Sequence, residues 1–434
     1  MERRRYVVAA FAGLLIGLEG FTAWQYALPA GFESAFILNP AGSEHFRRAI
    51  GVPRLEVALD LYRLGFRAWL CLAWAGYLAV VALGARGVPL LRRRSAHLLI
   101  GGVVLAAACL FPPSLSCDVY GYVAYGRMVA VYGVNPYAAG PIDVLLAKGD
   151  PVGPFLQWNI PAPYGPLWIS VARLFAWLTS NAPVFAQVLM MKLLGGAGVV
   201  AVAIAGRRVA ERLVPGRGDL TLIAIGLNPL FVIEGAGNGH NDLVMMAFVV
   251  LALDAGLAGR SRLAALSAGM AAAIKFLPLV LVPWLVVFAA RRLQAWWPRV
   301  RSMAIDAVMA ALPLVVSYAP YWFGAGTLRG VSQRLGGGQP LSATIAVGIG
   351  AALVGYGALT AWVLRNGAPR MLVGWLVVAG AVFLFATGMW LPWYLTWIWA
   401  PALVRWERGF KMVSVSVFGV AVILTLWYSI PGGF

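Results

Sequence analysis

Long apolar segments alternate with short polar and basic stretches along most of this 434-residue chain. Many windows of about 20 residues carry almost no charge, and an α-helix needs about that length to cross a hydrocarbon layer about 30 Å thick. The segments are too continuous for the alternating pattern of barrel strands, and a backbone in lipid otherwise has to be helical. The pattern therefore predicts an all-α, polytopic transmembrane protein of about 13 membrane-spanning helices. We expect these helices near residues 6–28, 67–85, 96–112, 184–206, 219–234, 241–258, 263–274, 276–290, 303–321, 341–364, 371–388, 391–404 and 412–430.

Clusters of arginine between the apolar segments indicate how the chain is threaded. Short loops rich in arginine and lysine face the cytoplasm, which here puts the N-terminus inside and the C-terminus outside. The first apolar segment, Tyr6–Leu28, is longer than the core of a signal peptide and has no convincing small-residue cleavage site, so we expect a retained anchor. The expected cytoplasmic clusters are Arg3–Arg5, Arg86 with Arg92–Arg94, Arg207 with Arg208, Arg260 with Arg262, Arg291 with Arg292, Arg365 with Arg370, and Arg405 with Arg408.

Some apolar stretches do not fit as ordinary crossings. Counting Pro166–Leu178 as a span would place the next basic cluster outside, so we assign it to the outer interface as a helix with proline in its first turn. The segments 263–274 and 276–290 are short and meet at Lys275, which indicates a broken pair with this lysine near the outer face. The second outer loop is rich in aromatic residues and proline, and we expect it to be ordered. The expected outer loops are residues 29–66, 113–183 and 322–340.

Composition narrows the possible function classes. Hydrophobic residues make up 61% of the chain and charged residues only 12%, against about 25% charged in soluble proteins. The net charge of +18 is divided among short clusters and forms no continuous patch, so we expect no nucleic-acid partner. Cys71, Cys109 and Cys117 indicate no disulfide framework, and the histidines and cysteines lack the spacing of a zinc site. We therefore expect neither a metal nor a cofactor.

The densest group of reactive side chains follows the third expected span. Asp118 stands at the outer end of that span, beside a predicted helix that carries Tyr122, Tyr125 and Arg127. A carboxylate at a partly dry, aromatic-lined boundary can act as a general base toward an acceptor hydroxyl. The alternative is that Asp118 only caps the helix beginning at Val119.

A second polar group, Gly237–Asp242, precedes a later span on the same side. Its glycines permit a close approach of the backbone, and His240 and Asp242 can exchange a proton or bind a phosphate or a sugar hydroxyl. Asn241 and Asp242 are also ordinary helix-capping residues, so a purely structural role is equally consistent with the pattern.

Cations and aromatic residues on the expected outer side complete the candidates. Lys275 interrupts an apolar run, and an ionisable residue there indicates function unless it snorkels to the interface. Arg329 and Arg334 occupy a glycine-rich outer loop, where they can bind a phosphate or remain solvated. Trp393 and Tyr394 can line a sugar or lipid site, or belong to an aromatic belt.

The order of these motifs resembles that of the GT-C superfamily of membrane glycosyltransferases. It is most similar to bacterial polyprenol-phosphate-mannose-dependent mannosyltransferases. Each motif is short and unspecific alone, whereas their ordered spacing from residue 116 to about residue 403 is fairly specific. The motifs are Cys117-Asp118-Val119-Tyr120, Gly126-Arg127, Asn135-Pro136-Tyr137, Tyr164-Gly165-Pro166-Leu167, Gly239-His240-Asn241-Asp242, Lys275-Phe276-Leu277-Pro278 and Pro392-Trp393-Tyr394.

The resemblance implies a metal-independent glycosyltransferase that inverts the anomeric carbon, with Asp118 as the base. The donor would be a polyprenyl-phosphate sugar, with mannose as the sugar that the family indicates and arabinose or another hexose as alternatives, and the acceptor a lipid, a glycan or a protein. The enzyme would be a multi-pass monomer among the lipids of the bacterial plasma membrane, with an extracytoplasmic active site. The donor phosphate would contact Lys275, Arg127, Arg329, Arg334 and His240, and the substrates would contact Asn241, Asp242, Tyr122, Tyr125, Tyr164, Trp393 and Tyr394.

The resemblance also divides the chain. Residues 1–95 would hold two added helices and the first outer loop, 96–404 the catalytic core with the base in loop 113–183, and 405–434 a last helix. Two other classes remain open at this point. A lipid-sugar flippase fits the break at Lys275 but not the carboxylates at the membrane boundary or the lack of internal repeats, and a structural subunit would hold a partner enzyme.

Overall fold

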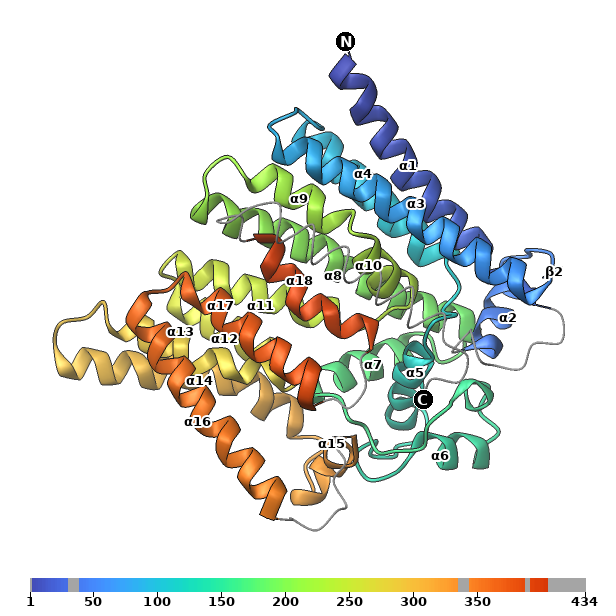
Figure 1. Cartoon of the computed structure of the whole chain (residues 1–434). Helices are drawn as coiled ribbons and strands as arrows, with labels where there is room; N and C mark the ends of the chain where they lie inside the picture. Colours follow the sequence, from blue (N-terminus) through green and yellow to red (C-terminus); the bar gives the residue numbers. More distant parts are fainter. Residues whose placement is uncertain (1, 30–38, 335–342, 387–390, 405–434) are drawn as a thin grey trace.

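A computed structural model describes residues 2–29, 39–334, 343–386 and 391–404, which form an almost wholly helical molecule (Figure 1). Five of the described helices are long and apolar enough to cross a membrane, and one bent pair raises that number to six. The predicted helical fold is therefore confirmed, whereas the count of 13 spans remains a prediction. The five helices are α1 (Glu2–Trp24), α3 (Leu59–Ala85), α4 (Arg93–Leu110), α8 (Val184–Leu213) and α14 (Trp296–Tyr318).

The N-terminal helices α1 and α3 pack tightly against each other because small residues line their contact. A Cβ atom on Gly17 would stand only 2.3 Å from the backbone nitrogen of Ala73, so this close approach depends on glycine. The pair is joined to the rest of the bundle through Tyr77, whose hydroxyl donates to the carbonyl of Ala224 at 2.7 Å. At one end of the pair, two short strands run in parallel, β1 (Ala27–Pro29) and β2 (Leu55–Val57).

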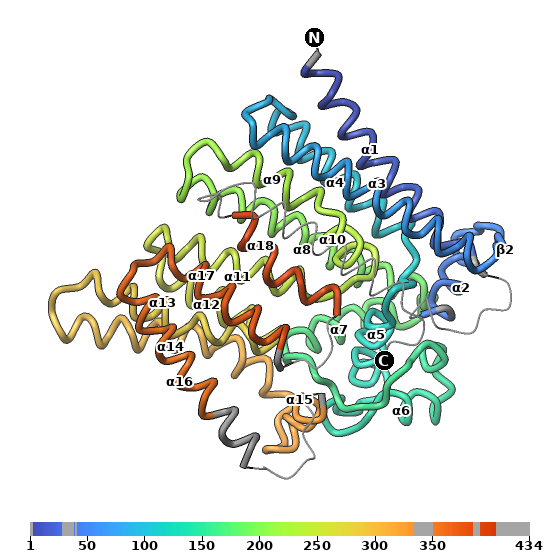
Figure 2. The backbone as a smooth tube through the Cα atoms, viewed as in Figure 1, coloured from blue at the N-terminus to red at the C-terminus, as the bar shows by residue number. Residues whose placement is uncertain are grey.

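The middle of the molecule is a bundle in which α18, the last helix described, lies beside α8 and α11 from much earlier in the sequence (Figure 2). Here too, glycine sets the spacing, since a Cβ on Gly198 of α8 would meet the backbone of Leu243 and Val244 at 2.7–2.8 Å. The expected last span, 412–430, lies outside the described residues, as do Arg405 and Arg408. The bundle helices after α8 are α9 (Gly218–Gly226), α11 (Asp242–Leu257), α12 (Ser261–Ala272), α13 (Leu281–Ala290), α16 (Ala343–Asn366), α17 (Arg370–Ala381) and α18 (Leu395–Val404).

A layer of shorter elements gathers at one end of the bundle, at the lower right of Figure 1. The segment between α4 and α8 forms most of it, as a series of short helices and turns. Its position along the outer membrane face remains a prediction. A Cβ on Gly126 of α5 would stand 2.3 Å from the carbonyl oxygen of Ala172 of α7, which explains how closely these two helices cross. The layer contains α2 (Pro40–Ala49), α5 (Asp118–Ala130), α6 (Pro141–Ala147), η1 (Gly153–Phe155), α7 (Pro166–Leu178), η4 (Ala325–Leu328) and α15 (Arg329–Arg334).

Two helical segments of the bundle are interrupted next to this layer. After α9, Pro229 cannot donate a backbone hydrogen bond, and the chain bends by 48° into a π-helical turn. The second break, between α12 and α13, holds Lys275, as the sequence predicted. Such breaks turn chain segments and side chains toward a common point. The short elements at these breaks are α10 (Pro229–Phe231), η2 (Val232–Gly237) and η3 (Leu277–Val280), while η5 (Val382–Ala386) follows α17 and η6 (Pro392–Tyr394) precedes α18.

Candidate active site

Asp118 is the first residue of α5, and its carboxylate faces the interior of the layer, with 7% of the side chain exposed. Its Oδ2 atom accepts from the hydroxyl of Tyr164 at 3.2 Å and from that of Tyr122 at 3.4 Å. The helix is capped at Cys117 without a side-chain bond, so Asp118 is not the capping residue that the alternative interpretation required. Two phenols orient one carboxylate oxygen, as a positioned base requires.

His240 lies in the short connection between η2 and α11, where Gly239 adopts a left-handed backbone with φ of 73°. Its Nδ1 atom is 3.5 Å from Oδ2 of Asp118, and its Nε2 atom is 3.3 Å from Oε2 of Glu234. The imidazole stacks on Trp393 with 4.0 Å between ring centres. Burial opposes a charge on this ring, but the carboxylates of Asp118 and Glu234 outweigh it and raise the pKa of His240 to about 9. The raised pKa favours the charged form of the ring at neutral pH.

Asp242 opens α11 and is fully buried. Its Oδ1 atom accepts from Nζ of Lys275 at 2.7 Å and from the indole of Trp397 at 2.6 Å. The ammonium of Lys275 also lies over the rings of Tyr394 and Trp397, 5.1 and 5.5 Å from their centres, which are distances of cation–π contacts. The break before α13 thus places the ammonium of Lys275 beside the first residue of α11.

Asn241 connects the two carboxylate groups. Its side-chain oxygen accepts from the hydroxyl of Tyr122 at 3.3 Å, and the same tyrosine contacts Asp118. Among the described residues, neither Nδ2 of Asn241 nor Oδ2 of Asp242 has a hydrogen-bond partner, although both atoms are buried. Folded proteins rarely leave such groups unpaired, so the pair offers a donor and an acceptor to a bound ligand. The contact network joins Asp118, Tyr122, Tyr164, His240, Asn241, Asp242, Lys275, Trp393 and Tyr394.

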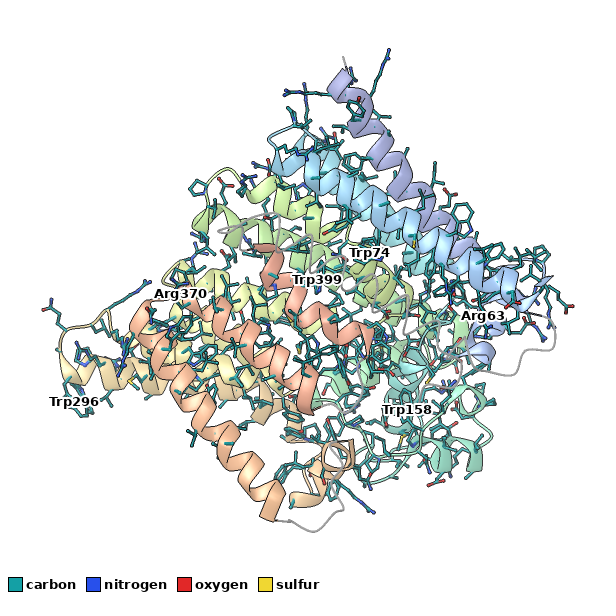
Figure 3. All side chains as sticks on the ribbon, viewed as in Figure 1. Arg63, Trp74, Trp158, Trp296, Arg370 and Trp399 are labelled. Carbon is teal, nitrogen blue, oxygen red and sulfur yellow. The ribbon has the colours of Figure 1, made fainter. Side chains whose placement is uncertain are left out.

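Tyr125 lies at the edge of this network. Its ring is 6.1 Å from that of Tyr164, while its hydroxyl donates to the carbonyl of Ile160 at 2.8 Å. The indole of Trp158, labelled within the layer in Figure 3, donates to the same hydroxyl at 3.3 Å. These contacts place Tyr125 where it supports the Tyr164 segment.

Arg127 takes part in a separate buried ion pair. Its guanidinium contacts Oδ2 of Asp150 through Nε at 2.8 Å and Nη2 at 2.7 Å. Nine residues along a helix separate it from Asp118, which corresponds to about 13.5 Å. The structure thus gives Arg127 a carboxylate partner away from Asp118, so we expect this arginine to support the fold of the layer in place of binding the donor phosphate.

Arg329 and Arg334 stand at the two ends of α15, the short helix in the loop after α14. Arg329 is exposed at the start of α15, whose next residue, Gly330, packs against the carbonyl of Pro161. The backbone of Arg334 ends the same helix, and its side chain lies outside the description. A phosphate role for either arginine remains a prediction.

Three residues near the network escaped the sequence analysis. Glu234 contacts His240, and Trp397 contacts Asp242. Lys192 of α8 is fully buried, where its ammonium donates to the carbonyl of Phe111 and lies 4.0 Å from the ring centre of Phe46. Glu234 and Lys192 each interrupt an apolar segment, and that signal was available in the sequence. No group of three metal-ligating side chains is found within the described ranges.

A family profile described as "Alpha-(1->6)-mannopyranosyltransferase, N-terminal domain" matches residues 44–291, which is more than half of the chain. The chain belongs to this family. The membership confirms the family that the motifs indicated. The match contains Asp118, His240, Asp242 and Lys275, whereas the aromatic residues of η6 and α18 lie beyond it.

Two curated relatives carry related names. Alpha-(1->6)-mannopyranosyltransferase B of Corynebacterium glutamicum is 30% identical over 167 residues, which are 37% of this chain and 27% of that protein. Alpha-(1->6)-mannopyranosyltransferase A of Mycobacterium tuberculosis is 27% identical over 355 residues, 74% of this chain and 67% of the relative. The chain thus spans about a quarter of the first relative and two thirds of the second. No solved structure matches the chain.

Proposed function

We propose that this protein transfers a mannosyl residue from a polyprenyl-phosphate carrier to an acceptor hydroxyl on the extracytoplasmic side of the membrane. The observation that carries the proposal is the buried Asp118, held by Tyr122, Tyr164 and His240 in a family of mannopyranosyltransferases. The layer that holds it lies at the end of the bundle away from the labelled Arg370 (Figure 3), a member of one expected cytoplasmic cluster.

The proposed step is a single displacement. The acceptor oxygen attacks the anomeric carbon while its proton moves to the carboxylate of Asp118. The bond between that carbon and the phosphate oxygen breaks on the opposite face, and the electron pair leaves with the lipid phosphate. Inversion of a β-linked donor gives an α-linked product, in keeping with the α-(1→6) linkage in the relatives' names.

Charge near the site supports a phosphate leaving group. Negative charge grows on the departing phosphate, and a positioned cation stabilises it more in the transition state than in the ground state. Lys275 is the cation best placed for this, because its side chain is 15% exposed while its partner Asp242 is fully buried. The unpaired Nδ2 of Asn241 and Oδ2 of Asp242 suit sugar hydroxyls, which donate and accept at once.

An apolar cavity supports a lipid-linked donor. It has a volume of about 470 Å³ between α1 and α4, within the usual range for small-molecule sites. Its lining is hydrophobic apart from Glu19 and Thr22, and it reaches Phe111, where the segment leading to Asp118 begins. We place part of the isoprenoid tail here, so that the phosphate and sugar extend toward the base.

A transfer assay with the purified full-length protein tests the proposal. Polyprenyl phosphates that carry mannose, glucose or arabinose are offered with an oligomannoside acceptor, and products are identified by mass spectrometry and anomeric NMR. We expect an α-mannoside from the mannose donor and none with Asp118→Asn. Movement of intact donor across vesicles without transfer would instead support a flippase, and activity only with an added enzyme would support a structural subunit.

A further inference from the structure

Glu234 is a buried carboxylate that the proposed displacement does not use. It is 1% exposed, and its Oε2 atom lies 3.3 Å from Nε2 of His240, on the side of the ring away from Asp118. Nδ2 of Asn238 donates to the same oxygen at 3.0 Å. The imidazole is therefore held between two carboxylates that come from different parts of the chain.

The backbone around Glu234 is built to fix this position. Glu234 sits in the π-helical turn η2, a rare form that is frequent at functional sites. The amide of His240 donates to the carbonyl of Glu234 at 3.0 Å. A Cβ on Gly195 of α8 would stand 2.1 Å from the carbonyl of Gly235, so α8 presses directly on the turn. The turn has little freedom to move without displacing His240.

A further contact links Glu234 to the segment that carries the base. The side-chain oxygen of Asn238 accepts from the backbone nitrogen of Leu115 at 3.3 Å, three residues before Asp118. Asn238 therefore joins Glu234 to the Asp118 segment, and His240 joins the two carboxylates directly. A change in the position or charge of Glu234 should therefore affect both His240 and Asp118.

We propose, on the basis of the function above, that Glu234 is a positioning residue that acts through His240 and keeps its imidazolium aimed at Oδ2 of Asp118. Each nitrogen of the doubly protonated ring lies within ion-pair distance of one carboxylate, 3.5 Å for Asp118 and 3.3 Å for Glu234. With a neutral amide in place of Glu234, the ring loses its counter-ion on the Nε2 side. A neutral ring that retains its proton on Nε2 turns a lone pair toward Asp118, which repels the carboxylate and disturbs its aim.

Other ionisable groups near the ring differ from Glu234 in their contacts. Lys192 packs under Gly239 through its stem, since a Cβ on that glycine would meet its Cγ at 3.1 Å, and its Nζ is directed to the Phe111 carbonyl. Asp242 is engaged by Lys275. Two phenols belong to the same network, since Tyr122 on α5 donates to Asp118 and Tyr394 on η6 packs against Trp393, on which the ring stacks. Asp118 and Glu234 are the carboxylates whose oxygens lie within 3.5 Å of the ring nitrogens.

Histidine NMR of the full-length protein in nanodiscs tests the contact directly. The chain has only three histidines, so ¹⁵N-histidine labelling gives three sets of ring signals, and His240→Gln assigns the relevant one. We expect the His240 titration to fall by about one pH unit or more in Glu234→Gln, and to be largely restored in Glu234→Asp. Glu56→Gln, which changes an exposed glutamate of β2, should leave it unmoved. An unchanged titration in Glu234→Gln overturns the inference.

Kinetics separate this inference from the proposed function. In Glu234→Gln, kcat should fall at pH 8 with little change in donor KM, by about twofold if the His240 titration falls by one pH unit and by about tenfold if it falls by two. The deficit should shrink toward pH 6, where His240 is protonated without help. A loss of equal size at every pH would indicate a merely structural role and overturn the inference. If the wild type transfers no sugar, the proposed function fails while the NMR titration still decides the contact. If Glu234→Gln does not fold, the NMR titration and the pH dependence of kcat are measured in Glu234→Asp, and both should stay close to the wild type.

Discussion

Lys275 and Asp242 form an ion pair of 2.7 Å across 33 residues of sequence, and the indole of Trp397 donates to the same carboxylate oxygen at 2.6 Å. The lysine comes from the break between α12 and α13, the aspartate from the start of α11, and the tryptophan from α18. Three parts of the chain thus meet at one buried charge. Since the other oxygen of Asp242 is unpaired among the described residues, the pair both supports the fold and leaves an acceptor for a ligand.

Replacing the lysine should impair both stability and donor binding. Lys275→Ala leaves Asp242 buried without its counter-ion, and we expect a loss of about 3 kcal/mol in the free energy of unfolding. The donor KM should rise by about tenfold or more, because a cation near the phosphate is lost. Thermal unfolding in nanodiscs and steady-state transfer kinetics measure the two effects.

A double variant separates the two effects. Lys275→Met combined with Asp242→Asn removes both charges, so stability should recover toward the wild type while the donor KM stays high. Recovery of KM together with stability would show that Lys275 acts only as a partner of Asp242. Unchanged kinetics in Lys275→Ala would remove the lysine from the phosphate site.

The base is the most direct prediction. Asp118→Asn keeps the size of the side chain but cannot take a proton, so transfer should fall by about 10³-fold with normal expression and folding. Asp143→Asn, which changes an exposed aspartate of α6 in the same layer, serves as the matched control. Activity of Asp118→Asn within a few-fold of the wild type would exclude Asp118 as the base.

Sequence patterns predicted the helices of this protein and the side of the membrane on which the site residues gather. The helical fold follows from apolar segments of membrane length. The grouping of Asp118, His240, Asp242 and Lys275 was expected because the basic clusters place all four on one side, and the structure brings them into one contact network. Which atoms would touch was not predictable, because helix breaks and turns set those distances.

Two residues show why the rest could not be predicted. Glu234 was counted as the end of a span, and only the π-helical turn after Pro229 carries it to His240. Arg127 was assigned to the donor phosphate through the family resemblance, but Asp150 pairs with it from 23 residues away. The ion pair with Asp150 forms because residues 131–149 return the chain to α5. The sequence pattern near Arg127 does not predict that return.

The Arg127–Asp150 pair should govern stability in place of catalysis. The side chains are 7% and 0% exposed, and Tyr132 also donates to Asp150 at 2.6 Å. Asp150→Asn breaks a buried pair on one side and should lower the free energy of unfolding by about 3–5 kcal/mol. The folded fraction should keep its donor KM within about threefold of the wild type. A large rise in KM with unchanged melting would return Arg127 to the phosphate site.

The stability of the protein should depend on pH through His240. Its pKa of about 9 in the folded state lies above the value of about 6.5 in an unfolded chain. A raised pKa stabilises the fold by an amount that is fully present below about pH 6.5 and is lost as the pH rises through about 9. Melting temperatures measured from pH 6 to pH 10 should fall across this interval. His240→Gln should flatten that decline, and an identical decline in the variant would contradict the assignment.

The cavity between α1 and α4 allows a test that fills space without disturbing the packing. A Cβ atom on Gly101 or on Gly102 would meet nothing within 4 Å, and Gly102 is among the residues that line the cavity while Gly101 is not. Consecutive residues of a helix point about 100° apart, so Gly101→Trp is a matched control for Gly102→Trp on the same turn of α4. Because the indole at residue 102 would occupy the space that we assign to the isoprenoid tail, the donor KM should rise by about tenfold, or about 1.4 kcal/mol, in that variant alone.

A truncated donor makes the same comparison decisive. A mannosyl phosphate on a single isoprene unit cannot extend along the cavity, so Gly102→Trp and the wild type should use it equally well. If the indole displaces the tail, the difference in donor KM between Gly102→Trp and the wild type should grow with the number of isoprene units. If Gly101→Trp and Gly102→Trp have the same KM for the long-chain donor, the tail lies elsewhere. A deficit of Gly102→Trp that is equal for short and long donors would mean instead that the indole acts on the path from Phe111 to Asp118.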